Sequence, residues 1–311
     1  MSSRSFDLSL SRREFLARSG VGAAALASGA LSKGVLASPA HATSASRSAA
    51  KYPIGIELYA VRTELAKDLP NTLKTVKHIG YEAVEFYAPY LDWTVAQAKD
   101  IRKQLDDLGL KCFSTHNTFA ALTPGETMTK AIALNQAIGA RNIILASPPT
   151  ATTADDWNRV AGQLATASEQ LKPHGLFAGF HNHFIEWKPL PGEQRPMDIL
   201  AANTPREFVL QLDVGTCLEA GADPVGWIKS HPGRIKSVHL KDWAPGRAAE
   251  EKGYRVLFGE GVAPWKEIFT AIESVGGVEY YLMEQEGSRY SEFDTAKRCL
   301  DTWRNMRSKM T

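Results

Sequence analysis

Eight short hydrophobic runs recur along the chain, and helical periodicity follows them. The runs are rich in β-branched or aromatic residues and occupy residues 54–59, 82–87, 111–116, 142–147, 176–181, 208–213, 235–240 and 280–285. After the first two runs, amphipathic helices are predicted over Leu69–Ile79 and Thr94–Leu108. Strands that alternate with helices pair in parallel, and eight such units can close on themselves. No linker rich in Pro, Gly or Ser divides the series, so the sequence predicts a single (β/α)₈ TIM barrel over residues 51–311.

Polar side chains stand at or near the ends of seven of these runs. They are Glu57, Glu85, His116, His181, Asp213, His239 and Glu284. In a TIM barrel the C-terminal ends of all strands open on one face, where active sites lie. A single buried histidine more often bonds a backbone carbonyl, and a single strand-end acid often caps a helix. Seven such residues at one end predict a functional site.

The fifth run ends in the segment GFHNHFIEW, from Gly179 to Trp187. On a regular strand end, His181 and His183 point the same way, into the barrel mouth, while Asn182 points outward. One imidazole can then ligate a cation while the other faces the substrate as an acid or a base. Glu186 either orients an imidazole or is a solvent-exposed loop acid, and the pattern favours the exposed position.

The N-terminal segment has the pattern of a twin-arginine (Tat) export signal. SRREFL at Ser11–Leu16 is followed by a weakly apolar run and by the small-residue exit Ala40-His41-Ala42. An amphipathic first helix would need polar residues where this run has mostly Ala and Gly. We expect residues 1–42 to be the signal and residues 43–50 a disordered linker. The Tat machinery would then export the folded chain to the periplasm, with no membrane segment left after processing.

The charge and the cysteine content of the chain argue against several kinds of binding partner and structural site. The first 42 residues hold five Lys or Arg and two Asp or Glu, so their removal changes the net charge from +2 to −1. This balance predicts binding neither to nucleic acid nor to an acidic membrane surface. Cys112, Cys217 and Cys299 are scattered and odd in number, so buried thiols are expected rather than disulfides or a zinc site.

Three segments resemble the xylose isomerase-like TIM barrels, the superfamily of sugar phosphate isomerases/epimerases and of family 2 AP endonucleases such as endonuclease IV. The segments are GFHNHFIEW, LDVGTCLEAGADPVGWIKSHPGRIKSVHLKDW and FGEGVAPWKEIFTAIESVGGVEYYLMEQE. The resemblance covers nearly all of the chain after the export signal. It implies an enzyme of sugars or cyclitols, but members isomerise, epimerise, dehydrate or cleave their substrates.

The resemblance also implies one divalent cation at the ends of strands five to eight. Its ligands would be His181, Asp213, His239 and Glu284, with His183 as the alternative to His181. Two nitrogens and two carboxylates suit Mn²⁺, Zn²⁺, Co²⁺ or Fe²⁺ better than Ca²⁺. The resemblance favours Mn²⁺ first and Zn²⁺ second.

His181 stands where relatives usually have a glutamate, and this affects the expected mechanism. The two-glutamate proton exchange of ketose 3-epimerases would retain only Glu284, so another base is needed among His183, His116 and Glu85. Lys241 either contacts a substrate hydroxyl or oxyanion, or forms an ion pair with Asp242 or a neighbouring acid. Loss of a proton next to a metal-bound ketone gives an enediolate, which leads to isomerisation, epimerisation or elimination. The resemblance of the HNH and HLKD motifs to those of keto-inositol dehydratases and of enzymes of 3-keto-sugar metabolism implies a keto-sugar of the 3-keto-glycoside or keto-inositol type.

Further residues past the strand ends are predicted to bind the sugar. They are Glu57, Tyr59, Trp187 and Trp243, and core packing is expected for about half of the aromatic residues in such positions. A phosphosugar isomerase is an alternative, with weak phosphate signals at Arg247 and Arg289. A non-catalytic periplasmic sugar-binding barrel is another. An endonuclease would need more metal ligands and a basic surface. The sequence leaves open whether the chain forms a homo-oligomer.

Overall fold

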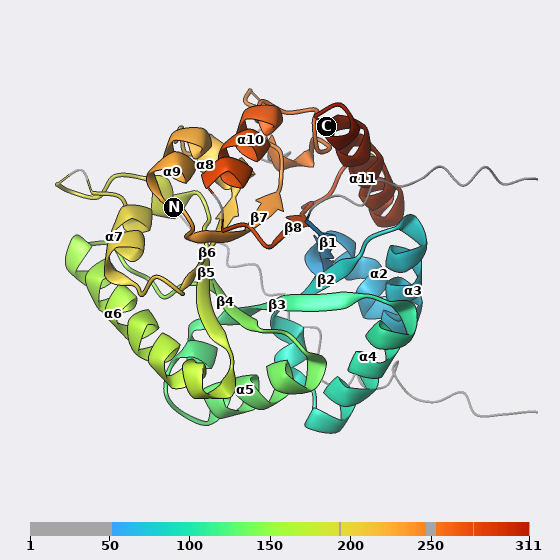
Figure 1. Ribbon diagram of the computed structural model, residues 1–311, viewed down its shortest axis with the longest axis horizontal. Coiled ribbons are helices and arrows are strands. Elements are labelled where there is room, and N and C mark those ends of the chain that lie inside the picture. Colours follow the sequence, from blue (N-terminus) through green and yellow to red (C-terminus); the bar gives the residue numbers. More distant parts are fainter. Residues whose placement is uncertain (1–51, 193, 247–252, 276, 311) are drawn as a thin grey trace, which may run out of the picture.

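Eight parallel strands form a closed barrel in the computed structural model, which describes residues 52–192, 194–246, 253–275 and 277–310 (Figure 1). The predicted TIM barrel is confirmed. The predicted export signal and linker lie outside the described residues. The strands are β1 (Ile54–Glu57), β2 (Ala83–Phe86), β3 (Lys111–Thr118), β4 (Asn142–Ser147), β5 (Phe177–His181), β6 (Val209–Asp213), β7 (Ile235–Leu240) and β8 (Tyr280–Met283).

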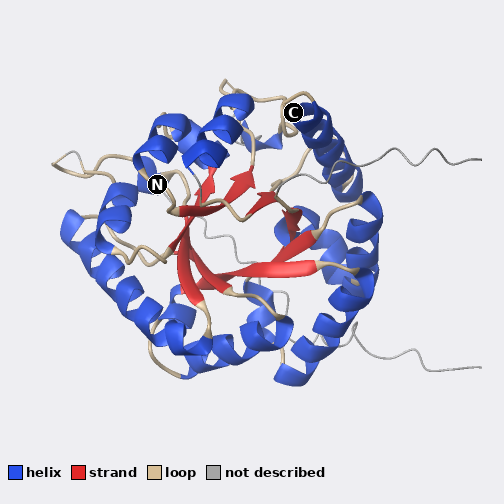
Figure 2. Ribbon diagram, in the orientation of Figure 1, coloured by secondary structure: helices blue, strands red, loops and turns tan. Residues whose placement is uncertain are grey.

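Helices surround the barrel on all sides (Figure 2). They are α2 (Arg62–Lys67), α3 (Leu69–Ile79), α4 (Val95–Leu108), α5 (Glu126–Ile138), α6 (Ala154–Leu171), α7 (Pro196–Asn203), α8 (Val214–Glu219), α9 (Pro224–Ser230), α10 (Trp265–Val275) and α11 (Glu292–Ser308). Helix α3 has the predicted bounds. Helix α4 begins one residue later than predicted, because Thr94 is its N-cap and accepts a hydrogen bond from the Gln97 amide.

Local sequence accounts for the helix ends. Gly80 and Gly109 follow α3 and α4 with φ values of 112° and 63°, which a side chain would disfavour. At the N-terminus of α4, Thr94 and Gln97 form a capping box. These signals stop each helix so that the chain can turn back into the next strand.

The core lies between the barrel and its helices. Strand residues such as Ile56, Val84 and Val238 are fully buried there. Inside the barrel, close packing leaves no room for a side chain at Gly179, where a Cβ would lie 2.4 Å from Ile144 Cδ1. All three cysteines are free and buried, as predicted. The strands therefore form a rigid support for the residues at their ends.

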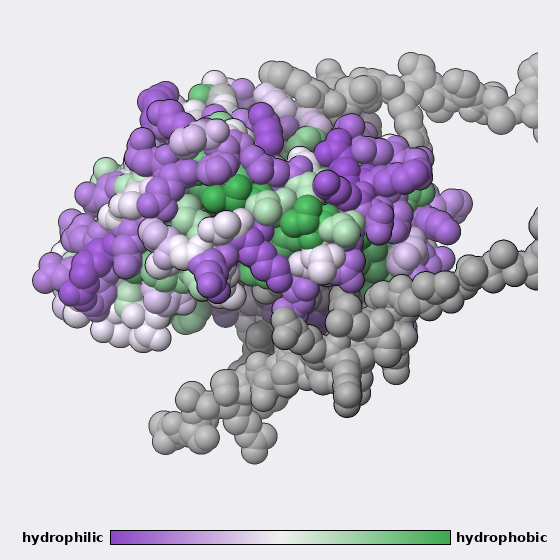
Figure 3. Space-filling view, turned by 90° about the horizontal axis from the view of Figure 1, so that it is seen from below, coloured by the Kyte–Doolittle hydropathy of each residue, from purple (hydrophilic) through white to green (hydrophobic). Residues whose placement is uncertain are grey.

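The surface is mostly hydrophilic on the face seen from below Figure 1, where small hydrophobic areas lie among polar residues (Figure 3). None of the helices in the described part of the chain is long and apolar enough to cross a membrane.

Candidate active site

The C-terminal ends of the strands bring the seven predicted polar residues into one buried cluster. Strand register places Glu57 opposite Glu85 and Asp213 opposite His239, so the side chains of each pair face the same side of the sheet. Ion-pair contacts of 4.0 Å or less then connect all seven residues. The sequence therefore predicted which strand ends meet in this site.

Three of the four predicted metal ligands converge closely. His181 Nε2 lies 3.7 Å from Asp213 Oδ2 and 3.9 Å from Glu284 Oε2, and the three residues offer ligand atoms within 4.8 Å of one another. Asp213 Oδ1 accepts a hydrogen bond from the Thr216 amide, while its buried Oδ2 has no hydrogen-bond partner among the described residues. A carboxylate oxygen that accepts no hydrogen bond and lies beside an imidazole fits a divalent cation.

The two imidazoles differ in protonation, and only the neutral ring of His181 is ready to bind a metal, whereas His239 would first have to lose a proton. Burial, together with the neighbouring His239, holds the pKa of His181 well below its usual value, so its ring is neutral. The His239 Nδ1 atom lies 2.5 Å from Glu284 Oε2. Burial lowers the pKa of His239, but Glu85 and Glu284 outweigh it and raise the pKa to about 10. A cation between His239 and Glu284 would replace a proton there.

Lys241 places an ammonium group against the same carboxylates. Its Nζ atom lies 2.9 Å from Glu284 Oε1, 3.3 Å from Asp213 Oδ2 and 2.6 Å from Glu286 Oε1. Burial lowers the pKa of Lys241, but these three carboxylates outweigh it and raise the pKa well above its usual value. The expected ion pair with a neighbouring acid is present, and it involves these acids rather than Asp242. A metal and the ammonium would therefore share Asp213 and Glu284.

Asp242 has a structural role in the loop after β7. Its buried carboxylate accepts hydrogen bonds from the amides of Trp243, Gly259, Gly261 and Ala263 and from the Trp265 indole. These five bonds fasten the loop that follows Lys241, and the loop carries Tyr254, whose ring lies 4.5 Å from the Lys241 ammonium.

Glu85 is surrounded by four polar side chains at the bottom of the site, which we call its floor. Its Oε2 atom is 2.8 Å from His239 Nε2 and 3.0 Å from His116 Nε2, and its Oε1 atom accepts hydrogen bonds from Gln211 and Ser114. Burial raises the pKa of Glu85, but the two imidazoles outweigh it and hold the pKa well below its usual value. A carboxylate with four partners is suited to orienting its neighbours.

His116 and Gln211 complete this floor. The Gln211 Oε1 atom lies 2.8 Å from His116 Nε2 and 3.1 Å from His181 Nδ1. His116 and His239 also join His181 in a second group of three imidazoles with ligand nitrogens within 4.8 Å of one another. The hydrogen bond that Gln211 Oε1 accepts from His181 Nδ1 fixes the ring of His181, as the partners of metal-bound histidines commonly do.

His183 lies just beyond the end of β5, with its ring centroid 5.1 Å from that of His181. Burial and the nearby Lys241 ammonium lower the pKa of His183 to about 4, so the ring is neutral at pH 7 and can accept a proton. Asn182 points out of the barrel, as predicted, where it donates to Thr216 Oγ1 and accepts from the Asp213 amide. The two imidazoles therefore reach the mouth side by side.

Glu186 differs from its expected position. Its side chain is fully buried, and Oε2 accepts a hydrogen bond of 2.7 Å from the His183 amide. A short 3₁₀ helix, Ile185–Trp187, turns the chain back and brings the carboxyl group under the HNH segment. Burial raises the pKa of Glu186 to about 7. The expectation of an exposed loop acid is wrong, and Glu186 supports the backbone of His183.

Two predicted sugar-binding aromatic residues remain partly open. Tyr59 and Trp243 are half-buried, and Tyr59 packs edge-on to Tyr87 with 5.6 Å between ring centroids. Trp187 is only 2% exposed and lies in the core, edge-on to Trp227. The ring of Trp187 is thus covered by protein on the helical side of the barrel.

Glu57, the fourth residue predicted to bind sugar, is 1% exposed at the end of β1. Its Oε1 atom lies 4.0 Å from His116 Nδ1, and neither carboxyl oxygen has a hydrogen-bond partner among the described residues. Burial raises the pKa of Glu57 to about 8.

Sequence reasoning gave no role to Gln211, Glu286 or Tyr254. Gln211 precedes Asp213 by two positions and Glu286 follows Glu284 by two. Side chains alternate between the two faces of a strand, so residues two positions apart face the same way. This spacing could have predicted that Gln211 and Glu286 face the mouth together with Asp213 and Glu284. Tyr254 lies in the loop after β7, and its approach to Lys241 follows from no spacing in the sequence.

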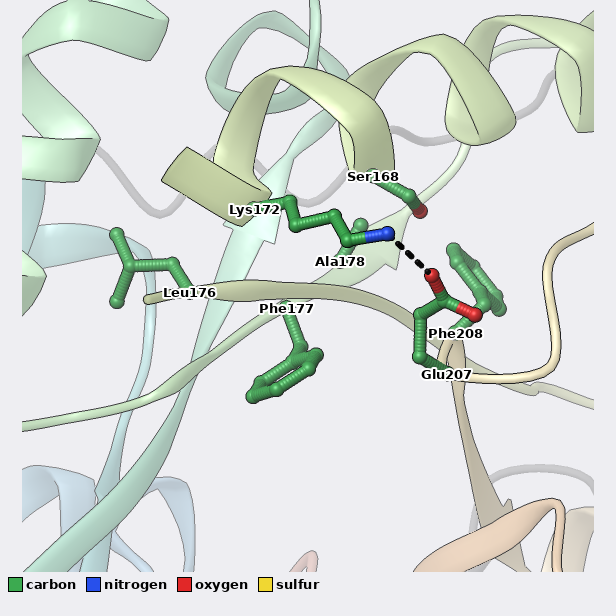
Figure 4. Close-up of a pocket in the computed structure, with 7 residues that line it drawn as sticks. All are labelled: Ser168, Lys172, Leu176, Phe177, Ala178, Glu207 and Phe208. Carbon is green, nitrogen blue, oxygen red and sulfur yellow. Dashed lines mark ion pairs between the residues drawn. The ribbon is translucent and has the colours of Figure 1, made fainter. Parts of the chain in front are cut away.

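A small cavity of about 150 Å³ lies at the opposite end of the barrel. Figure 4 shows its lining, where Phe177 and Phe208 stand at the start of β5 and just before β6, and Lys172 forms an ion pair of 3.6 Å with Glu207. The other lining residues are Ser168, Leu176 and Ala178. This lining offers no histidine or unpaired acid, so we place the active site at the C-terminal face.

Known proteins with similar sequences are named for reactions of sugars and cyclitols. A putative L-ribulose-5-phosphate 3-epimerase of Escherichia coli is 28% identical over 252 residues; the match covers 71% of this chain and 85% of that protein. An inosose dehydratase of Lacticaseibacillus casei is 26% identical over 172 residues; the match spans 50% of this chain and 57% of the dehydratase. These relatives confirm that the chain is an enzyme of the sugar isomerase/epimerase group.

Solved structures agree with the fold. A sugar phosphate isomerase/epimerase from Parabacteroides distasonis superposes with a TM-score of 0.71 at 25% identity, covering 85% of this chain and 97% of that one. The IolI protein, whose structure contains a zinc atom, has the same fold at 14% identity and a TM-score of 0.64, covering 83% of this chain and 99% of that one. The family model for the xylose isomerase-like TIM barrel matches residues 73–306, and the chain belongs to this family.

Proposed function

We propose that the protein is a divalent metal-dependent enzyme that removes the proton next to the ketone of a keto-sugar, of the 3-keto-glycoside or keto-inositol type. The observation that carries this proposal is the convergence of ligand atoms from His181, Asp213 and Glu284 within 4.8 Å of one another, beside the neutral ring of His183. His181, Asp213, His239 and Glu284 would hold the ion, with Mn²⁺ first and Zn²⁺ second. When bound, the ion would supply Lewis acidity that stabilises negative charge on the ketone oxygen.

The residues of the chain divide the remaining work. His183 accepts the proton, since its ring is neutral at pH 7 and only half-buried. Lys241 stays protonated among its three carboxylates, so its positive charge favours the nearby oxygen on which negative charge develops. Glu85 and Gln211 hold the rings of His239 and His181 in place. Tyr59 and Trp243 offer aromatic surface to the sugar ring.

Both types of named relative support this chemistry. One is named for epimerisation of L-ribulose 5-phosphate at C3 and the other for dehydration of an inosose. Both substrates are ketones, and a carbonyl group acidifies the neighbouring C–H bond. The phosphosugar alternative is supported by the name of the Escherichia coli relative. Against it, the guanidinium of Arg289 forms two hydrogen bonds, of 2.8 and 2.6 Å, with Glu260, and this carboxylate offsets the positive charge that would attract phosphate. Arg247 lies outside the described residues.

The test is an NMR screen in deuterated solvent. The Mn²⁺-loaded protein would be incubated with 3-keto-glucosides, keto-inositols and phosphorylated ketoses, and loss of the signal of the proton next to the ketone would be followed. The proposal expects exchange or product with the keto-sugars and none with the phosphoketoses. Activity confined to the phosphoketoses would support the alternative. Binding of keto-sugars without exchange would indicate a non-catalytic sugar-binding barrel.

We also propose that the chain acts in the periplasm after export by the Tat machinery. The support is the twin-arginine pair Arg12-Arg13 with its apolar run and the small-residue exit at Ala40–Ala42.

A further inference from the structure

Two large hydrophobic side chains are exposed beside the mouth, where the chain turns after β5. Phe184 is 41% exposed and Ile185 is 52% exposed. Among the residues that the structure describes, the other exposed large hydrophobic residues stand singly in the chain, and they are Val95, Val262 and Tyr290. Single exposed hydrophobic residues are common on protein surfaces and need no explanation. The adjacent pair at the edge of an active site does need one.

The same turn buries a carboxyl group. Glu186 and Trp187 come directly after the pair, and they are 0% and 2% exposed. The Glu186 carboxyl group accepts a hydrogen bond from the His183 amide, and Trp187 lies in the core. A turn that buries an acid and exposes two hydrophobic side chains is the reverse of what hydrophobic burial favours. The two buried residues anchor the turn, so the exposed pair is presented to solvent by a fixed backbone.

The pair lies next to the residue that is proposed to accept the substrate proton. Phe184 directly follows His183, so their Cα atoms are about 3.8 Å apart. The floor of the site is filled by the hydrogen-bonded side chains of Glu85 and Gln211. A large substituent on a sugar in the mouth therefore has room only toward solvent, past the edge where the pair lies.

The pair is too small for a protein interface and large enough for one substituent. Stable protein interfaces bury roughly 1,200–2,000 Å² in total, with about 20–30 residues on each side. Here the apolar surface ends at Lys188, whose ammonium lies 5.6 Å from the centroid of the Phe184 ring and donates a hydrogen bond to the Ala220 carbonyl. A single aromatic or alkyl group would cover the two side chains.

We propose that Phe184 and Ile185 bind an apolar substituent of the substrate, so that the substrate is a keto-sugar that carries an aromatic or alkyl group. This inference rests on the proposed removal of a proton next to a ketone, and it favours a substituted keto-glycoside over a keto-inositol. Contact with the substituent removes apolar surface of both partners from water. An aromatic substituent also packs edge-on or offset against the Phe184 ring. The pair thus sets specificity and takes no part in the chemical step.

The selectivity between two substrates tests this role. We compare methyl and 2-phenylethyl 3-keto-glucosides with the Mn²⁺-loaded protein, and follow exchange of the C2 proton with deuterated solvent by NMR. Both substituents are attached through an alkyl oxygen, so the acidity of the C2 proton is nearly the same and the apolar contact differs. The wild type should prefer the 2-phenylethyl substrate by about tenfold or more in kcat/KM.

Phe184→Ser combined with Ile185→Ser should bring this preference close to one, mainly by raising the KM of the 2-phenylethyl substrate. Ile185→Ser alone, at the more exposed position, should lower the preference in the same direction. Val262→Ser is the matched control, because Val262 is 51% exposed in the loop between β7 and α10. We expect this control to keep the wild-type preference.

Several results would overturn this inference while leaving the proposed function standing. Exchange by the wild type at equal kcat/KM with both substrates is one, and exchange confined to keto-inositols is another. An equal loss on both substrates in the double variant would show a structural role for the pair. A wild-type dimer that becomes a monomer in the double variant, with the preference unchanged, would assign the pair to contact between two copies of the chain. Absence of exchange in the wild type with every keto-sugar would instead overturn the proposed function, and this inference with it.

Discussion

Replacing Glu186 with glutamine should stabilise the protein at alkaline pH. The Glu186 carboxyl group is fully buried and accepts one hydrogen bond, from the His183 amide. Its other oxygen, Oε1, has no hydrogen-bond partner among the described residues. Glutamine has the same shape and keeps a carbonyl oxygen for the His183 amide. The substitution therefore removes a titratable group while retaining the hydrogen bond.

The magnitude follows from the shift of the Glu186 pKa. Burial raises this pKa from 4.5 in the unfolded chain to about 7 in the folded protein. The folded state therefore favours the protonated form, and wild-type stability falls as the pH rises from about 4.5 through about 7. A difference of about 2.5 pKa units corresponds to about 3 kcal/mol once both states are ionised. The variant lacks this loss.

The assay is urea-induced unfolding of wild type and Glu186→Gln at pH 5 and at pH 8.5. At pH 5 the two midpoints should lie close together. At pH 8.5 the variant should be more stable, by up to about 3 kcal/mol. A difference in stability that is the same at both pH values would show that ionisation of Glu186 is not its cause, and a variant less stable than wild type at pH 8.5 would show the same.

Two further predictions concern metal and export. Asp213→Ala and Glu284→Ala should each lose nearly all bound ion in elemental analysis, because each removes a carboxylate from the group around His181; full occupancy in both variants would rule this ligand set out. Arg12→Lys combined with Arg13→Lys should leave the protein in the cytoplasm in cell fractionation, because the twin-arginine receptor reads that pair as an address. Normal periplasmic levels of this double variant would mean that SRREFL is only a basic N-terminus.

The fold was predictable because buried parallel strands appear as continuous apolar runs, and helices as amphipathic ones. The ends of elements were less predictable. The first run was expected to extend to Tyr59, but β1 stops at Glu57 because Leu58–Val61 forms a 3₁₀ helix. The 3₁₀ helix depends on packing above β2. No spacing in the sequence predicts that packing.

The location of the site could be predicted from the sequence, but the contacts between its residues could be predicted only in part. Strand ends of a barrel must meet, so the seven polar residues could be grouped from sequence alone. Which of them touch depends on side-chain directions across the barrel. Glu85 and His239 are 154 positions apart and lie 2.8 Å from each other, and Glu286 reaches Lys241. Trp187 follows a strand end as Trp243 does, but Trp227 of α9 covers it.

In the proposed mechanism, one imidazole of the HNH segment holds the metal while the other moves the substrate proton. Its most direct test measures metal content and the exchange of the proton next to the ketone with deuterated solvent, in His183→Gln and in His181→Gln. We predict that His183→Gln keeps its metal and exchanges about 10²–10⁴-fold more slowly than wild type, whereas His181→Gln binds metal weakly. Wild-type exchange in His183→Gln would move the base to His116 or Glu85. Loss of the metal from His183→Gln would contradict the division between the two histidines.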